Sequence, residues 1–263
     1  MEMLVRLGVF AAVLATMATW EFWWPTRRLS LARRRRWPIN LGLAAFNVLL
    51  MRLSIGAAAW LAANWAVEQQ IGLFNTFKPP QAVAIALSLL LLDLAIYAQH
   101  VAAHRWRWFW RLHQVHHSDL DFDTSTALRF HPLEIMLSML YKVVLVILLG
   151  APPVAVVAFE VILNGCALFN HGNVSLPPGL ERYCRYLLVT PDMHRIHHSA
   201  LPAETDSNYG FSLSCWDRLF RTYCRQPQQL QTVMRIGLDG YRDAGELGFM
   251  SLLAMPFRPL RKR

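Results

Sequence analysis

The stretch from Ile135 to Phe169 reads IMLSMLYKVVLVILL–GAPP–VAVVAFEVILNGCALF, and it decides the fold. Its apolar halves, Ile135–Leu149 and Val154–Phe169, are each shorter than the roughly 20 residues that a bilayer crossing needs. The segment between them, Gly150–Pro153, contains two adjacent prolines and is expected to break a helix. The stretch therefore predicts a hairpin of two short helices, which returns the chain to the side from which it came.

Three longer apolar runs precede this hairpin. Leu7–Trp24, Leu41–Val67 and Gln81–Ala103 each have the length and hydropathy of a membrane span. A cleaved signal peptide is the rival interpretation of the first run, but the basic cluster follows its apolar residues instead of preceding them. Arg52 lies near the middle of the second run, where a charge is costly and is expected to face the bundle interior or a watery cleft.

The basic residues are distributed unevenly around these spans. Lys78 is the only basic residue in the loop from Glu68 to Pro80, whereas six arginines follow the first span. The six are Arg27, Arg28, Arg33, Arg34, Arg35 and Arg36. By the positive-inside rule the arginine-rich loop is cytoplasmic, and the hairpin keeps everything after Phe169 on the same side. We therefore expect a multi-pass protein of a bacterial inner membrane.

The composition of the whole chain agrees with this class. Of its 263 residues, 55% are hydrophobic and 16% are charged, whereas a soluble domain carries about a quarter charged residues. These values exclude a disordered chain and an ordinary soluble domain. The net charge of +9 would suit a nucleic-acid-binding protein, but such a protein carries its basic residues on a soluble domain, so no nucleic acid is expected. The four cysteines lack the C-x-x-C spacing of a zinc ribbon or an iron–sulfur site.

Ten histidines form the most informative pattern. His100 and His104 are four residues apart, and two further groups have the spacing H-x-x-H-H. These groups are His113, His116 and His117, and His194, His197 and His198. On a helix, residues three or four apart share a face, so each H-x-x-H-H is expected to offer positions i and i+3 to one ion and position i+4 to a second. Eight imidazoles exceed the needs of one zinc ion and suit two ions of higher coordination number, with iron, zinc and copper compatible.

Other polar residues lie near these groups. His171 follows the hairpin directly and is a further candidate ligand, whereas His131, before Pro132, is as consistent with a structural role as with metal binding. Asp93 and Tyr97 continue the helical stripe of His100, and an aspartate inside a span is a functional candidate that would orient a ligand or another polar group. Four further aspartates are interpreted individually as solvated loop carboxylates, although any one could support a ligand: Asp119, Asp121, Asp123 and Asp192.

The topology provides an independent test of the site. The three histidine groups can share one site only if they share one membrane face. A single crossing between residues 135 and 169 would separate the last group from the others, whereas the hairpin keeps all three together. We therefore expect an all-α integral membrane protein with three transmembrane helices, a short helical hairpin and a cytoplasmic helical cap that carries the histidine cluster.

At this point the sequence resembles the fatty acid hydroxylase / sterol desaturase superfamily of membrane di-iron oxygenases. The matching segments are Asp93-x-x-x-Tyr97-x-x-His100-x-x-x-His104, Trp110–Ser118, Arg129–Glu134, Asn170–Asn173, Thr190–Ser199, Asn208–Gly210 and Trp216–Phe220. The resemblance covers roughly residues 80–225, which we take as the catalytic domain. Residues 1–79 then form the N-terminal membrane helices and basic loop, and residues 226–263 form a basic cytoplasmic tail.

The resemblance implies two irons, O2 as co-substrate, and hydroxylation or desaturation of a lipid C–H bond. It implies that the eight motif histidines are catalytic and that His171 joins them as a metal ligand. Some fatty acid hydroxylases have a further H-x-x-x-H before the last group, whereas this chain has Ala167 four residues before His171. That difference leaves Asn170, Asn173 or water as additional ligand candidates.

The expected partners follow from what the chain lacks. It has no Gly-x-Gly-x-x-Gly, no ferredoxin-type cysteines and no evident haem domain, so electrons are expected from a separate ferredoxin-, cytochrome- or reductase-type donor. The lipid substrate is expected from the bilayer, with sterol, fatty acyl chain, carotenoid and glycerol ether lipid all open. Two other functions would use the same histidines: a zinc-dependent membrane hydrolase, and a non-enzymatic metal-binding or transport protein. A transporter, however, would hold its ligands near the middle of the membrane.

Overall fold

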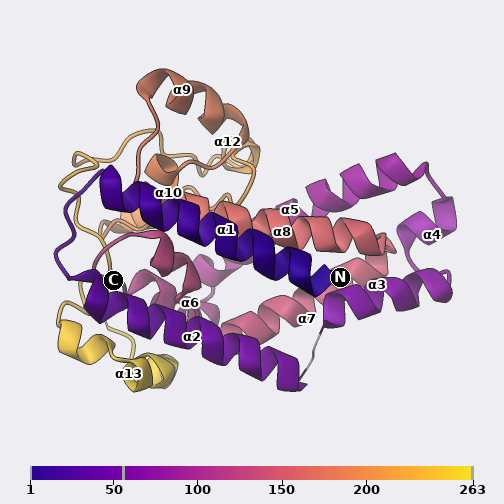
Figure 1. Ribbon diagram of the computed structural model, residues 1–263, viewed down its shortest axis with the longest axis horizontal. Helices are drawn as coiled ribbons and strands as arrows, with labels where there is room; N and C mark the ends of the chain where they lie inside the picture. Colours follow the sequence, from indigo (N-terminus) through magenta and orange to yellow (C-terminus); the bar gives the residue numbers. More distant parts are fainter. Residues whose placement is uncertain (1, 55–56, 262–263) are drawn as a thin grey trace.

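The computed structural model describes residues 2–54 and 57–261 (Figure 1). Within these ranges the chain forms α-helices, short 3-10 helices and loops, with two isolated β-bridges and no strand. The predicted all-α class is therefore confirmed. The five long helices are α1 (Glu2–Trp23), α2 (Arg33–Ser54), α5 (Gln81–Arg105), α7 (Pro132–Leu149) and α8 (Pro153–Asn170).

Five helical segments of the described chain are long and apolar enough to cross a membrane: Leu4–Trp23, Arg33–Phe77, Gln81–Arg105, Pro132–Leu149 and Pro153–Asn170. The first and third coincide with predicted spans. The second predicted span contains two helices, since α2 ends at Ser54 and α3 (Ala58–Glu68) follows, with Ile55 and Gly56 outside the described residues. The short α4 (Leu73–Phe77) precedes α5. These helices are those of a multi-pass membrane protein.

The predicted helix break occurs where the prolines require it. Helix α7 ends at Leu149 and is followed by Gly150, which has a left-handed φ of 62°, and α8 begins at Pro153. A Cβ on Gly150 would lie 2.8 Å from the backbone carbonyl oxygen of Ile71, so glycine is required by space as well as by conformation. Each helix has 18 residues, so both are longer than the short halves predicted from the sequence. The difference arises partly because α7 begins at Pro132, about one turn before the predicted start at Ile135.

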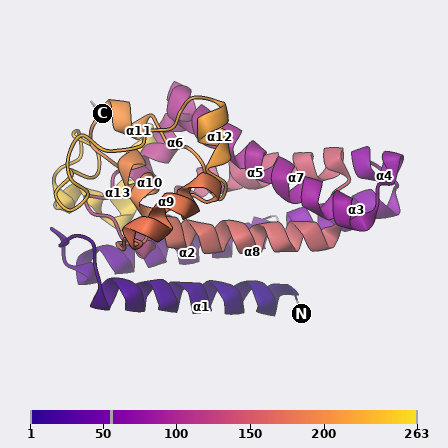
Figure 2. The same cartoon turned by 90° about the horizontal axis from the view of Figure 1, so that it is seen from above.

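The long helices form a bundle along the longest axis of the molecule (Figures 1 and 2). Helix α1 packs along α8, while α3 and α5 each contact both α7 and α8. A buried ion pair joins α7 to α8, since Lys142 Nζ lies 2.6 Å from Glu160 Oε1. Arg6 of α1 also pairs with Glu160. Lys142, Arg6 and Glu160 are therefore neutralised within the apolar bundle by partners on neighbouring helices.

A cap of short helices covers one end of this bundle. It lies where α5 ends, α7 begins and α8 ends, so the hairpin formed by α7 and α8 returns the chain to the cap. The cap elements are α6 (Arg107–His117), η1 (Thr124–Leu128), α9 (Pro178–Leu187), α10 (Pro191–His197), α11 (Pro202–Thr205), α12 (Cys215–Leu219), η2 (Ala244–Leu247), α13 (Phe249–Ala254) and η3 (Met255–Phe257).

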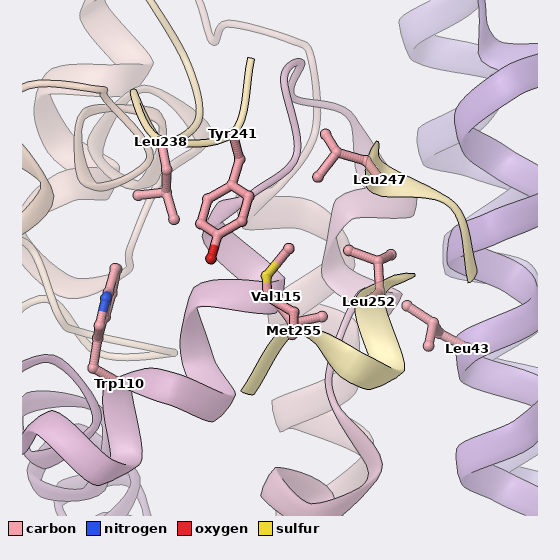
Figure 3. Packing of buried hydrophobic residues seen from close by; sticks show 8 residues of the cluster. All are labelled: Leu43, Trp110, Val115, Leu238, Tyr241, Leu247, Leu252 and Met255. Carbon is pink, nitrogen blue, oxygen red and sulfur yellow. The ribbon is translucent and has the colours of Figure 1, made fainter. Parts of the chain in front are cut away.

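The basic C-terminal segment is part of the cap's hydrophobic core. Figure 3 shows this core, in which side chains of the segment lie between Trp110 of α6 and Leu43 of α2. Leu43 comes from α2, Trp110 and Val115 come from α6, and the C-terminal segment supplies Leu238, Tyr241, Leu247, Leu252 and Met255. All eight side chains are buried. The segment therefore holds α6, the helix with three of the histidines, against α2.

Buried carboxylates fasten the first two helices to the cap. Arg36 of α2 donates to Asp119 over 2.7 Å and to Asp123 over 2.6 Å. Glu21 of α1 accepts the backbone N–H groups of Thr124 and Asn173, over 2.6 and 2.8 Å. Burial favours the neutral form of Asp119, but the Arg36 guanidinium outweighs it and holds the pKa of that carboxyl well below its ordinary range.

The interpretation of the loop aspartates as solvated carboxylates is wrong for three of them. Asp119, Asp121 and Asp123 are all buried. Asp121 accepts the backbone N–H groups of Ser30 and Leu31, which lie in the arginine-rich loop. The positive charges of that loop attract these carboxylates into the interface, where each finds donors that offset its desolvation.

Candidate metal centre

The nine histidines suggested as ligands are all buried at the cap end of the bundle. His100 and His104 lie on the last turns of α5, and His171 follows the last residue of α8. Helix α6 carries His113, His116 and His117, and α10 carries His194 and His197, with His198 directly after it. Pro191 occupies the first turn of α10, and the Thr190 hydroxyl caps the helix by accepting the Met193 N–H. The structure thus gathers all three motifs and His171.

These side chains form two groups that could each hold a metal ion. In each group the potential ligand atoms all lie within 4.8 Å of one another. The first group comprises His100, His104, His113, His117 and His197, and the second comprises His116, His171, His194 and His198. The fold therefore creates two adjacent imidazole clusters from segments that are far apart in the chain.

The two H-x-x-H-H motifs divide differently from our expectation. His113 and His117, at i and i+4, belong to one group, whereas His116, at i+3, belongs to the other. The second motif repeats this division, with His194 and His198 together and His197 apart. With 3.6 residues per turn, position i+4 is displaced by about 40° from position i, and position i+3 by about 60°. The i+4 residue is therefore the closer in direction, and the predicted i, i+3 pairing is wrong.

Backbone carbonyls fix the orientation of several imidazoles. Nδ1–H of His100 donates to the Tyr209 carbonyl over 2.8 Å, and Nδ1–H of His197 donates to the Ser207 carbonyl over 2.7 Å. Because a carbonyl can only accept, each of these rings carries its proton on Nδ1. Nε2 of both rings is buried and makes no hydrogen bond in the described structure. Each Nε2 thus presents a lone pair to the first group.

Two carboxylates perform the same task within the first group. Nδ1 of His113 lies 2.6 Å from Glu134 Oε1, and Nδ1 of His104 lies 3.2 Å from Asp206 Oδ1. Metal-bound histidines commonly donate their other N–H to a carboxylate, which raises the basicity of the ligand. The sequence prediction assigned no role to Glu134 or Asp206. The one available signal was the position of Glu134 in the segment Arg129–Glu134, which carries part of the family resemblance.

The second group fits a metal ion on an independent criterion. Nε2 of His171 lies 3.1 Å from Nε2 of His116 and 3.0 Å from Nε2 of His194. Nδ1–H of His171 donates to the Ala167 carbonyl, so its Nε2 has one lone pair facing two nitrogens. Two nitrogens bound at about 2.0–2.1 Å to one ion, at angles of 90–110°, lie about 2.9–3.4 Å apart. A cation at this position would satisfy all three rings.

The protonation states agree with this chemistry. Burial lowers the pKa of His171 to about 4 and that of His197 to about 3. Burial likewise holds the pKa values of His116, His194 and His198 well below the ordinary imidazole value. These rings are therefore neutral at neutral pH, which is the form that binds metal. A set of neutral imidazoles is compatible with iron, zinc or copper.

His131 lies outside both groups. Its Nδ1 accepts the Leu133 N–H over 3.2 Å and so caps α7, while its Nε2 lies 3.1 Å from the Leu253 carbonyl. Both ring nitrogens are occupied by protein partners, and the carbonyl requires the proton to be on Nε2. Of the two interpretations left open for this residue, the structural one is therefore correct.

Two other candidates also have structural partners. Asp93 accepts from Trp216 Nε1 over 2.9 Å and from the Leu213 N–H over 3.2 Å, so it fastens α5 to the segment around α12. The side-chain amide of Asn173 donates to the Arg27 carbonyl and accepts the Arg27 N–H. Of the two asparagines considered as ligands, Asn170 alone has a side-chain oxygen with no hydrogen bond in the described structure.

A largely apolar cavity of about 410 Å³ leads from the bundle to both histidine groups. Residues of α1, α2, α5, α7 and α8 line it, and His100, His113, His116 and His194 are among them. Its volume lies in the range of ligand-binding pockets. Arg52 also lines this cavity, so the mid-helix arginine faces a cleft as predicted.

The family model for fatty acid hydroxylase matches residues 85–222, which include all nine clustered histidines. The chain is similar to the ornithine lipid hydroxylase OlsE of Rhizobium tropici, at 29% identity over 208 residues that cover 78% of this chain and 60% of that protein. It is also similar to the alkylglycerol monooxygenase of Xenopus tropicalis, at 32% identity over 147 residues, or 55% of this chain and 31% of that protein.

A third similarity is to the very-long-chain aldehyde decarbonylase GL1-1 of Oryza sativa subsp. indica, at 28% identity over 254 residues that cover 90% of this chain and 39% of that protein. The chain thus spans less than two thirds of the length of each of these relatives. No solved structure matched the chain.

Proposed function

We propose that this chain is a membrane-bound, non-haem di-iron oxidoreductase that uses O2 to hydroxylate or desaturate a lipid. The proposal starts from the family, since the chain belongs to the fatty acid hydroxylase family. The observation that carries the proposal is the pair of buried histidine groups at the end of an apolar cavity. Within the chain we take residues 80–225 as the catalytic domain.

We assign the nine clustered histidines as the ligands of two iron ions. His100, His104, His113, His117 and His197 would hold one ion, and His116, His171, His194 and His198 would hold the other. When bound, the two irons supply the O2 chemistry that an unactivated C–H bond requires, which no side chain can provide.

The chain's own residues orient the ligands, exclude water and admit the lipid. Tyr209, Ser207 and Glu134 hold three imidazoles in the tautomer that leaves Nε2 free for metal. Burial of all nine rings keeps bulk water from the centre. The apolar cavity gives a lipid chain a path from the bundle to His100 and His116.

The reaction requires reducing equivalents. Hydroxylation of a C–H bond consumes O2, two electrons and two protons and yields an alcohol and water. Desaturation consumes the same reagents, removes two hydrogen atoms from the lipid, and yields an alkene and two waters. We propose a separate ferredoxin-, cytochrome- or reductase-type protein as the electron donor.

The names of the similar proteins suggest a class of substrate. Their names refer to ornithine lipids, alkylglycerols and very-long-chain aldehydes. We propose a bilayer lipid with a long apolar chain as the substrate of this protein. From the arginine-rich loop we further propose that the cap faces the cytoplasm of a bacterial inner membrane.

Metal analysis combined with lipid mass spectrometry tests this function. The protein purified in detergent is expected to contain about two irons per chain. Cells that express it are expected to accumulate a lipid that has gained one oxygen atom or lost two hydrogen atoms. His116→Ala and His197→Ala are expected to abolish the product. His131→Ala is the matched control, since His131 is a nearby histidine outside both groups, and this variant is expected to retain the product.

Two results would contradict the proposal. Zinc as the only metal, with turnover independent of O2, would indicate a hydrolase. Metal binding by wild-type protein, with an unchanged lipidome in the presence of iron, O2 and reductant, would indicate a metal-binding or transport protein.

A further inference from the structure

We propose that Arg52 binds the anionic group of the lipid substrate, a carboxylate or a phosphate, at the open side of the cavity. The protein would thereby select acidic lipids over neutral lipids of the same chain length. This inference rests on the proposed function, because it takes the apolar cavity as the path of the substrate.

The first observation is the charge of the cavity wall. Of the described residues that line the cavity, Arg52 and Glu134 are the two with charged side chains. Glu134 is buried and lies 2.6 Å from His113 Nδ1, so its negative charge serves the histidine group. Arg52 therefore supplies the positive charge of a cavity whose walls are otherwise mostly apolar. A cation within a span is costly and persists where it faces a cleft or a ligand.

The second observation is the position of Arg52 relative to the histidines. Asn47, five residues earlier on α2, donates to the Phe130 carbonyl over 2.9 Å. The Phe130 ring in turn stacks on His116, with ring centroids 4.3 Å apart. Asn47 thus lies level with the second histidine group, and Arg52 follows it by about 7.5 Å along the helix axis. An anion held by Arg52 would lie near the metal centre without reaching the ligands.

The third observation is that exposed and polar residues line part of the cavity wall. Arg52 and Asn164 are both exposed and both line the cavity, so the cavity is open where these two side chains lie. Ser138 and Gln99 also line the cavity, and Ser138 Oγ donates to Gln99 Oε1 over 3.3 Å. Polar groups from α2, α5, α7 and α8 therefore line a cavity that is otherwise largely apolar. Such a site suits a lipid with one polar end, and a guanidinium matches the geometry of a carboxylate or phosphate.

A binding experiment separates this role from that of a simple membrane anchor. The iron-loaded full chain in a non-ionic detergent is titrated anaerobically and without reductant, so that no turnover occurs. The probes are palmitate, its neutral methyl ester, and hexadecyl phosphate. The wild type is expected to bind at least one of the two anions about tenfold more tightly than methyl palmitate, since only the anions can form charge-assisted hydrogen bonds with the guanidinium. The anion that binds more tightly, palmitate or hexadecyl phosphate, shows whether the site prefers a carboxylate or a phosphate.

Variants then assign the preference to one residue. Arg52→Leu is expected to bind the preferred anion about tenfold more weakly, with unchanged affinity for methyl palmitate and unchanged iron content. Arg52→Lys is expected to retain part of the preference, because it keeps the charge without the planar fork. Arg35→Leu is the matched control, since Arg35 lies on the same helix, exposed and outside the cavity lining, and it is expected to bind as the wild type does.

Two results would overturn the inference: a wild type that binds methyl palmitate as tightly as both anions, or an Arg52→Leu variant that keeps the full preference. The first comparison needs no variant and therefore holds even if Arg52→Leu fails to fold. Arg52-dependent anion binding by a protein that never consumes O2 would instead contradict the proposed function, and only the role of Arg52 in binding a lipid anion would stand.

Discussion

At the scale of single residues, the hydrogen-bond partners of the two ring nitrogens determine whether a histidine can bind a metal. In His100 and His197 a backbone carbonyl takes the Nδ1 proton and leaves Nε2 for a metal, whereas in His131 protein partners occupy both nitrogens. The same residue type thus becomes a ligand candidate or a helix cap according to its neighbours. Two substitutions test this distinction.

Replacement of Glu134 by glutamine is expected to weaken metal binding. The amide keeps the shape of the side chain but cannot hold the His113 N–H as strongly as a carboxylate does over 2.6 Å. Loss of such a partner typically lowers metal affinity or activity about 10- to 100-fold. Iron retention during dialysis against a chelator measures the effect. Glu68→Gln, at an exposed position on α3, is the control, and equal iron retention by the two variants would refute the role of Glu134.

Replacement of His131 by alanine is expected to affect stability and not metal content. The substitution removes the cap of α7 and the contact with Leu253, so a loss of about 1 kcal/mol in the free energy of unfolding is expected. His131→Asn, which can still cap the helix, should recover part of the loss. Thermal unfolding and metal analysis provide the two measurements. A drop in iron content comparable to that of His116→Ala would indicate that His131 is a ligand after all.

At the scale of elements, α2 connects the cavity to the cap. Its first turns carry Arg36, whose guanidinium bonds Asp119 and Asp123, and its later turns carry Asn47 and Arg52 on the cavity wall. The C-terminal segment packs against both α2 and α6 and so connects the two helices. The positions of the α6 histidines therefore depend on contacts made by helices that carry no histidine themselves.

Arg36→Gln is expected to destabilise the cap. The substitution leaves two buried carboxylates without their cation, and breaking a buried ion pair costs about 3–5 kcal/mol. Hydrogen exchange in η1 and α6 should increase, and the unfolding temperature should fall. Arg35→Gln, at the neighbouring exposed position, should leave both unchanged. Equal unfolding temperatures for the two variants would show that the buried pair does not hold the cap.

At the scale of the whole molecule, the return of the chain through α7 and α8 brings the histidine motifs to one end. The break at Gly150–Pro153 is local, but its consequence extends over the entire chain, because His113 and His194 can meet only if the intervening helices lead back to the cap. The proposed orientation in the membrane follows from the same topology.

Cysteine labelling tests that orientation. In a background without the four native free cysteines, Lys78→Cys and Asp239→Cys each introduce one exposed thiol, in the loop before α5 and in the cap respectively. With the cap cytoplasmic, a membrane-impermeant maleimide added to spheroplasts should label Lys78→Cys at once and Asp239→Cys only after permeabilisation. The reverse labelling pattern would show that the cap faces the periplasm. Immediate labelling of both thiols would show that the loop before α5 and the cap lie on the same side of the membrane.

The sequence by itself determined the helical class, the break between α7 and α8, and the identity of the clustered histidines. These properties are local: apolar runs, prolines and residues spaced three or four apart act through the geometry of a few turns of chain. That is why the same pattern also predicted that Asp93, Tyr97, His100 and His104 line one helical stripe. All four lie on α5, and the structure adds that they are buried.

The tertiary structure alone decided how the histidines divide between two groups and which partners orient them. It paired His100 with Tyr209, buried Asp119 against Arg36, and joined Glu21 to Asn173, which are 152 residues apart. No local spacing encodes such contacts, because they depend on which helix faces pack together. Burial then decides the chemistry, since a carboxylate or imidazole removed from water must find a partner, and that partner lies wherever the fold brings one.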